Sequence, residues 1–202
     1  MDSTATANTN ANANEPLFTG KEQTIYDGLV PRAIYQPLLK ASVALPWRYG
    51  WNTPANPTAR YWHHEVGFGN KQNTECISDN VRKHPLKALA EYQQWVLSRA
   101  PHGTKMLRFY FNAYTYGTDG WPHTDTEREG EQTAVLYLTD RWQPAWAGET
   151  VVFDDAGDVA LAALPRRNRI ITFPSNALHA PRPLARAFTG LRVVLVVKLG
   201  MP

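Results

Sequence analysis

The sequence predicts a mainly β protein in which helices come first and one antiparallel β core follows. A chain of 202 residues corresponds to one domain at about 150 residues per domain, and its 43% hydrophobic residues can bury a sizeable core. Beyond residue 104, short runs rich in Val, Ile, Tyr and Phe alternate with turns, without helical patterns between them. This order is typical of an antiparallel sandwich or barrel. Strands are expected at 106–114, 133–138, 149–153, 159–164, 169–173 and 191–198.

The N-terminal part of the chain predicts a tail followed by supporting elements. Residues 1–15 alternate Ala, Asn and Thr with almost no bulky apolar side chain, so we expect a flexible low-complexity tail. A single domain is expected to fill 16–202. Within it, 16–104 would supply helices and loops that support the β core at 105–202.

Two helices are expected ahead of the β core. The stronger prediction is 84–99, where Pro85 lies in the first turn and apolar residues recur at helical spacing. A second apolar stripe predicts a helix within 31–45, started or interrupted near Pro37. The segment 46–60 contains three prolines and is expected to be a loop. The apolar positions are Leu86, Leu89, Tyr92 or Gln93, and Val96 in the first helix, and Ile34, Leu38, Leu39 and Val43 in the second.

The composition excludes several classes of protein. The sequence has no run of about 18 apolar residues that would predict a transmembrane helix, and its N-terminus lacks the pattern of a secretory signal. The single cysteine, Cys76, can form neither an internal disulfide nor a thiolate metal site, which fits a reducing compartment. A net charge of +3 is too small to indicate nucleic-acid binding. We therefore expect a cytoplasmic protein with no membrane or nucleic-acid partner.

The first candidate for chemistry is the pair His123 and Asp125. On an extended segment, side chains two residues apart point to the same face, so the imidazole and the carboxylate would converge. His179 is the other histidine of the β half and the candidate third ligand. Two histidines and one carboxylate form the facial site of non-haem Fe(II) oxygenases. The alternative is that this short motif arises by chance, with His123 on the surface and His179 in a loop.

Arg192 is the second candidate, because it begins the last expected strand, which is otherwise hydrophobic on both faces. A buried guanidinium needs an anionic partner, and no acidic residue follows Asp158 in the sequence. A bound carboxylate, such as the distal one of a 2-oxoacid that chelates iron at its other end, would satisfy it. The alternative is an ordinary edge or surface arginine.

Four segments together resemble the Fe(II)/2-oxoglutarate-dependent oxygenases, in particular their prolyl-4-hydroxylase-like branch. They follow one another in the same order and at similar spacing between Leu107 and Leu199, and the stretch Trp47–Trp51 also resembles small bacterial and phage members. The segments are Ala113–Asp125 (AYTYGTDGWPHTD), Thr133–Asp140 (TAVLYLTD), Ala147–Val151 (AGETV) and Leu164–Phe173 (LPRRNRIITF), followed by His179 and Arg192.

The resemblance implies a distorted double-stranded β-helix, or jelly roll, with N-terminal helices packed against one sheet. It implies that His123, Asp125 and His179 bind Fe(II), and that Arg192 anchors the distal carboxylate of the co-substrate 2-oxoglutarate, with O2 as the second co-substrate. Tyr114 and Thr133 match positions whose hydroxyls contact the same carboxylate, although ordinary strand packing also explains them. Many relatives carry Ser or Thr two positions after the anchoring arginine, where this chain has Val194.

The function implied is a dioxygenase that hydroxylates an unactivated C–H bond of a small molecule, such as an amino acid or biosynthetic intermediate, and releases succinate and CO2. The alternatives are a peptidyl hydroxylase of the prolyl type and a non-catalytic, cupin-like binding protein. Candidate substrate contacts are Trp121, Tyr116 and Trp146, whose alternative role is packing. Arg166, Arg167 and Arg182 would favour an acidic substrate, and a structural or rim role is expected for His63-His64-Glu65.

Overall fold

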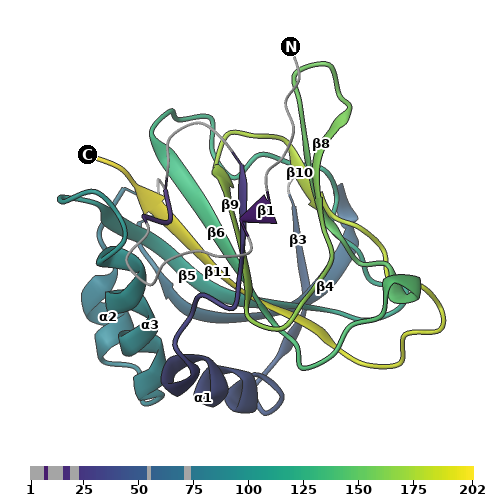
Figure 1. The fold of residues 1–202 in the computed structure, drawn as a ribbon, viewed down its shortest axis with the longest axis horizontal. Helices are drawn as coiled ribbons and strands as arrows, with labels where there is room; N and C mark the ends of the chain where they lie inside the picture. Colours follow the sequence, from purple (N-terminus) through teal and green to yellow (C-terminus); the bar gives the residue numbers. More distant parts are fainter. Residues whose placement is uncertain (1–6, 9–15, 19–22, 54–55, 71–73) are drawn as a thin grey trace.

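The computed structural model describes residues 7–8, 16–18, 23–53, 56–70 and 74–202. Its strands form a large mixed sheet and a small antiparallel sheet that face each other (Figure 1). The large sheet has the order β1-β2-β9-β6-β11-β5-β4-β3, and the small one β10-β7-β8. The strands are β1 (Ala7–Asn8), β2 (Thr24–Asp27), β3 (Arg48–Thr53), β4 (Asn56–Phe68), β5 (Lys105–Tyr114), β6 (Glu131–Leu138), β7 (Thr150–Phe153), β8 (Val159–Ala163), β9 (Arg169–Pro174), β10 (His179–Pro181) and β11 (Arg192–Gly200).

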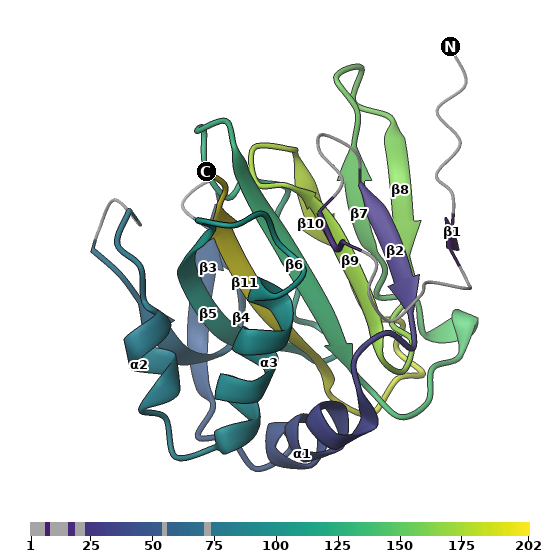
Figure 2. The same ribbon diagram turned by 60° about the vertical axis from the view of Figure 1, so that its left-hand side comes forward.

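The helices cover one face of the large sheet, and the small sheet lies on its other face (Figure 2). They are α1 (Arg32–Ser42), α2 (Ser78–Arg82) and α3 (Lys87–Leu97), with one 3-10 turn, η1 (Pro144–Trp146). The fold is the distorted double-stranded β-helix with N-terminal helices that was expected, and the predicted strands from 106 onward are confirmed with small shifts at their ends. None of the helices in the described part of the chain has the length and apolarity needed to span a bilayer.

The pleat of the large sheet sorts side chains between two cores. On β11, Val193, Leu195 and Val197 face the helices, and Val194 and Val196 face the small sheet. Because side chains alternate along a strand, Arg192 and Lys198 lie on the same face as Val194 and Val196. The ends of β11 therefore direct two buried cations toward the space between the sheets.

The prediction of a loop over 46–60 is wrong. It forms β3 and the first part of β4, an antiparallel pair at the edge of the large sheet. Buried Ala59, Tyr61 and His63 alternate along β4 with residues that are more exposed, and β4 pairs with β5. The packing of this alternating pattern on β5 outweighs the prolines, which lie at or near the ends of the strands.

The expected helices are present with different ends. α1 runs through Pro37 without interruption and ends before Val43, which is 74% exposed and is not part of the buried stripe. In α3, both Tyr92 and Gln93 are buried, together with Leu89 and Val96. Of the predicted tail, only Ala7–Asn8 lie within the described residues, where they pair with Ile25 and Tyr26 of β2.

Candidate active site

His123 and His179 face each other across an antiparallel bridge. The backbone N–H of each donates to the carbonyl oxygen of the other at 3.0 Å, and their ring centroids lie 4.4 Å apart. The convergence was expected from an extended segment over 123–125, whereas in the structure only His123 is paired and Asp125 lies in a bend. The bridge and this bend, instead of one strand face, bring the three side chains together.

The ligand atoms of His123, Asp125 and His179 all lie within 4.8 Å of one another. His123 Nε2 is 3.6 Å from Asp125 Oδ1, and His179 Nε2 is 3.8 Å from Asp125 Oδ2. The Nδ1 atoms lie near carbonyl oxygens, at 2.7 Å from Trp121 O and 3.0 Å from Ala177 O. With Nδ1 donating to these carbonyls, each neutral ring presents its Nε2 lone pair toward the carboxylate.

Two side chains hold the Asp125 carboxylate from opposite sides. Thr133 donates its hydroxyl to Oδ2 at 2.7 Å and also contacts Ser175 Oγ at 2.8 Å. Lys198 Nζ lies 2.5 Å from Oδ1, and both side chains of this ion pair are about nineteen-twentieths buried. Burial raises the pKa of Asp125, but Lys198 and the two imidazoles outweigh it and hold the pKa well below its usual range. The carboxylate is therefore ionised at neutral pH.

This donor set fits a hexacoordinate iron ion. Metal–donor bonds of about 2.1 Å at right angles need donors about 3 Å apart, and the observed separations of 3.6 and 3.8 Å are only slightly wider. Burial lowers the pKa of His179 to about 4, so its imidazole is neutral at physiological pH, as a ligand must be. Three donors on one side leave the opposite side of the ion for other ligands.

Arg192 lies at the other end of the same pocket and is 1% exposed. It donates from Nε to Gly148 O at 2.7 Å and from Nη2 to Thr150 Oγ1 at 2.8 Å. Its guanidinium carbon lies 5.1 Å from the ring centre of Tyr114 and 5.3 Å from that of Tyr137. Within the described residues, Arg192 forms no ion pair with an acidic side chain, so its charge is matched by dipoles and ring faces only.

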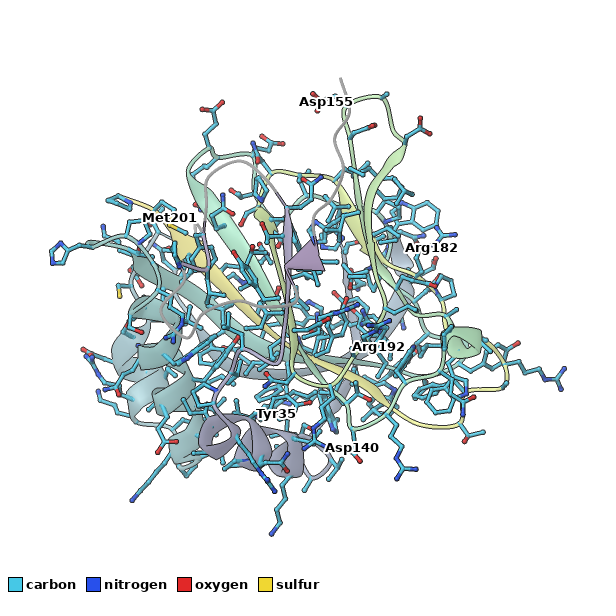
Figure 3. The ribbon with its side chains drawn as sticks, viewed as in Figure 1. Tyr35, Asp140, Asp155, Arg182, Arg192 and Met201 are labelled. Atoms are coloured by element: carbon cyan, nitrogen blue, oxygen red, sulfur yellow. The ribbon has the colours of Figure 1, made fainter. Side chains whose placement is uncertain are left out.

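The pocket between these two ends is polar and aromatic. Arg192 at the beginning of β11 can be located in Figure 3, where Met201 marks the residue after its end. The pocket is lined by Tyr61, Tyr110, Asn112, Tyr114, His123, Asp125, Thr133, Val135, Thr150, His179, Pro181, Arg192, Val194 and Val196. It therefore combines a candidate metal centre with a candidate carboxylate anchor.

A family model described as the 2OG-Fe(II) oxygenase superfamily matches residues 109–197, which contain the three candidate ligands and Arg192. Residues 109–197 belong to this superfamily. These residues therefore form an iron- and 2-oxoglutarate-dependent oxygenase region of the oxidoreductase type, and they contain the converging donors. No curated protein sequence matches the chain significantly.

Solved structures with the same fold include prolyl hydroxylases and an enzyme named HygX. A Trichoplax adhaerens prolyl hydroxylase in complex with a hypoxia inducible factor peptide shares 12% identity, with a TM-score of 0.61 over 88% of this chain and 83% of that one. A Pseudomonas putida prolyl-4-hydroxylase shares 14%, with a TM-score of 0.58 over 89% and 92%. HygX of Streptomyces hygroscopicus, with nickel and 2-oxoglutarate bound, shares 12%, with a TM-score of 0.59 over 90% and 83%. At these identities the likeness concerns the fold.

The two expected co-substrate contacts occupy different ends of the oxygenase pocket. Tyr114 is the register partner of Arg192 and lies beside it, as expected. Thr133 instead pairs with Lys198, six residues along β11, or about 20 Å at 3.3 Å per residue. Its hydroxyl contacts Asp125, at the metal end of the pocket.

Several side chains at the site were not anticipated. Thr150 accepts from Arg192 and from the hydroxyl of Tyr137 at 2.7 Å, so it supplies the hydroxyl next to the guanidinium that Val194 cannot. Thr150 ends the Gly-Glu-Thr segment, which was the signal in the sequence. Lys198 had no such signal, because only the register between β11 and β6 places it opposite Thr133.

The predicted substrate contacts lie outside the residues that line the pocket. Trp121 and Tyr116 are exposed, and Trp121 approaches the site only through its carbonyl contact with His123. Trp146 packs against Trp142 and Phe188, with ring centroids 5.5 and 5.2 Å away.

The three arginines suggested for an acidic substrate also lie outside this lining. Arg167 pairs with Asp140, which lies on the α1 side of the molecule near Tyr35 (Figure 3). Arg166 and Arg182 are exposed. The structure therefore gives no support to their proposed role at the pocket.

Proposed function

We propose that this oxygenase hydroxylates an unactivated C–H bond of a small molecule, using His123, Asp125 and His179 as iron ligands and Arg192 as the anchor for 2-oxoglutarate. The observation that carries the proposal is the pairing, in one pocket, of three converging donors with a buried guanidinium that forms no ion pair with any carboxylate of the described residues. A molecule with a chelating 2-oxoacid at one end and a carboxylate at the other satisfies both ends at once.

When bound, iron supplies the chemistry that couples the conversion of 2-oxoglutarate and O2 into succinate and CO2 to the oxidation of a C–H bond. The protein's own residues orient the three iron ligands and bind the co-substrate. Thr133 and Lys198 fix the carboxylate of Asp125, and the carbonyls of Trp121 and Ala177 fix the two imidazoles. Arg192 binds the distal carboxylate, with Tyr114 against its guanidinium.

The exposure of the ligands supports access for substrate from the His123 side. The His123 side chain is 22% exposed, whereas those of Asp125 and His179 are 5% and 8% exposed. Around this opening the described residues form no long binding module beyond the oxygenase fold itself. A compact ligand that enters past His123 is the simplest match.

A peptidyl hydroxylase is the second candidate. It is favoured by the exposed aromatic side chains of Tyr49 and Trp51 on β3, which is the edge strand of the large sheet, a position where an extended peptide can add as a further strand. Trp51 stacks on His63, which contacts the pocket residue Asn112 at 2.8 Å, so this edge is connected to the pocket.

The test measures iron-dependent succinate formation from 2-oxoglutarate, together with mass spectrometry of two substrate pools, a metabolite extract and a peptide library. An increase of about 16 Da in a metabolite supports the proposal, because that is the mass of one inserted oxygen. The same increase in peptides alone identifies the second candidate. Arg192→Met should raise the 2-oxoglutarate requirement about 100-fold or more, since a buried charge pair is lost, whereas exposed Arg186→Met should leave it unchanged. Succinate formation that persists in His179→Ala would overturn the ligand assignment.

A further inference from the structure

Lys198 is a buried cation at the candidate metal centre whose role the proposed reaction leaves open. It is 4% exposed, lies in β11 opposite Thr133 of β6 and Arg108 of β5, and places Nζ 2.5 Å from Asp125 Oδ1. The nearby acidic side chain Glu131 forms its own ion pair with Arg128 at 2.5 Å. Asp125 is therefore the main counter-charge of Lys198.

The net charge around the pocket indicates how this ion pair affects the binding of a metal ion. With neutral histidines, the negative charge of Asp125 is cancelled by Lys198, and Arg192 leaves one positive charge in excess. A divalent ion alone raises that excess to three, and dianionic 2-oxoglutarate returns it to one. If residue 198 were neutral, the pocket with the ion alone would carry two positive charges, and the pocket with both ligands would carry none.

From this balance we propose that Lys198 weakens the hold of the site on a divalent metal, because its charge offsets that of Asp125, the anionic ligand. The inference rests on the proposed ligand set. Like charges a few Å apart in a partly dry site repel strongly, and the repulsion between Lys198 and the metal acts both with and without 2-oxoglutarate.

Positioning of Asp125 does not require Lys198. Thr133 holds Oδ2 at 2.7 Å, and the backbone N–H of Asp125 donates to Ser175 O at 2.8 Å, so the carboxylate keeps its orientation when the lysine is replaced. Residues around Lys198 include Tyr110, whose ring centre is 5.9 Å from Nζ, and Val196, so a methionine of similar length finds apolar neighbours there. The two effects of the lysine, charge and orientation, can therefore be separated by substitution.

The experiment measures the Kd of Mn(II) for the full chain, with and without 2-oxoglutarate, from the EPR signal of the free ion. Lys198→Met should bind Mn(II) about tenfold more tightly than the wild type, both alone and in the presence of 2-oxoglutarate, so the gain from adding 2-oxoglutarate should stay the same. Lys198→Arg keeps the charge and should keep the wild-type affinity. Lys105→Met removes an exposed lysine at the beginning of β5 and serves as the matched control.

The outcomes separate the two proposals. If Lys198→Met binds Mn(II) alone as weakly as the wild type or more weakly, the inference is overturned, and the lysine acts by orienting Asp125. If His179→Ala binds Mn(II) as tightly as the wild type does, the ligand set of the proposed function is wrong, whatever the effect of Lys198. Circular dichroism of each variant establishes that it is folded, and Lys198→Gln, which also removes the charge, replaces the methionine variant if that variant does not fold.

Discussion

Replacing Gly148 by alanine should destabilise the fold and weaken 2-oxoglutarate binding together. Gly148 has φ of +77°, a region that L side chains rarely adopt, and its carbonyl accepts from Arg192 Nε. A Cβ at this position would lie 2.6 Å from Leu184 Cδ2, 3.2 Å from Trp142 Cζ2 and 3.4 Å from Arg192 Cδ. The new methyl group must therefore displace Leu184 and crowd the Arg192 side chain itself.

The expected loss of unfolding free energy in Gly148→Ala has two parts. An alanine at positive φ costs about 1 kcal/mol, and an added methyl in a packed site costs about 1–3 kcal/mol more, so the unfolding free energy should fall by about 2–4 kcal/mol. Gly157 offers a matched control, because its φ is +86° and a Cβ there meets nothing within 4 Å. Gly157→Ala should therefore lose only about 1 kcal/mol.

Urea denaturation measures the first effect, and calorimetric titration with 2-oxoglutarate in the presence of Mn(II) measures the second. We expect Gly148→Ala to bind 2-oxoglutarate about tenfold more weakly and Gly157→Ala to bind it normally, since a misplaced charged hydrogen bond is worth about 1.4 kcal/mol or more. Equal losses of stability in the two variants, or unchanged 2-oxoglutarate affinity in Gly148→Ala, would refute the reasoning.

Three further predictions concern the rest of the site. Thr133→Val removes the hydroxyl that contacts Asp125 and should weaken Mn(II) binding about tenfold with little change in fold; unaltered binding in titrations would argue against this contact. Gly120→Ala would bring a Cβ within 2.4 Å of Pro181 Cγ, so we expect at least about 1 kcal/mol lower stability and weaker metal binding, and a thermal melt identical to that of the wild type would contradict it. Burial lowers the pKa of His63 to about 4, so the unfolded chain binds its proton first and stability should fall as pH drops from about 6.5 to 4, by about 3 kcal/mol at most. His63→Gln should flatten that part of the pH profile, and an unchanged slope in urea melts would show that other groups cause it.

The β core could be predicted because its strands carry their own pattern. Runs such as 133–138 and 192–199 are buried on both faces, so they are apolar almost throughout and are bounded by turns. The β3–β4 hairpin could not be predicted in the same way. Its sequence mixes prolines with aromatic residues, and its strand structure depends on pairing with β5, which is distant in sequence.

The candidate site, too, could be predicted only in part from the sequence. His123 and Asp125 are neighbours in sequence, and their spacing alone indicated a metal site. The contacts of Thr133 and Lys198 depend on which residues of β6 and β11 lie opposite each other, and this register is a property of the folded sheet. For this reason neither the contact of Thr133 with Asp125 nor the position of Lys198 was anticipated.

The position of β11 has a consequence for the order of folding in the cell. β11 is the last strand of the sequence, yet it lies between β5 and β6 and makes ladders with both. Until it has emerged from the ribosome, the strands on its two sides have no hydrogen-bonded connection through the middle of the sheet. His123, Asp125 and His179 are therefore synthesised before Arg192, and completion of the pocket must wait until β11 is available to pair with both neighbours.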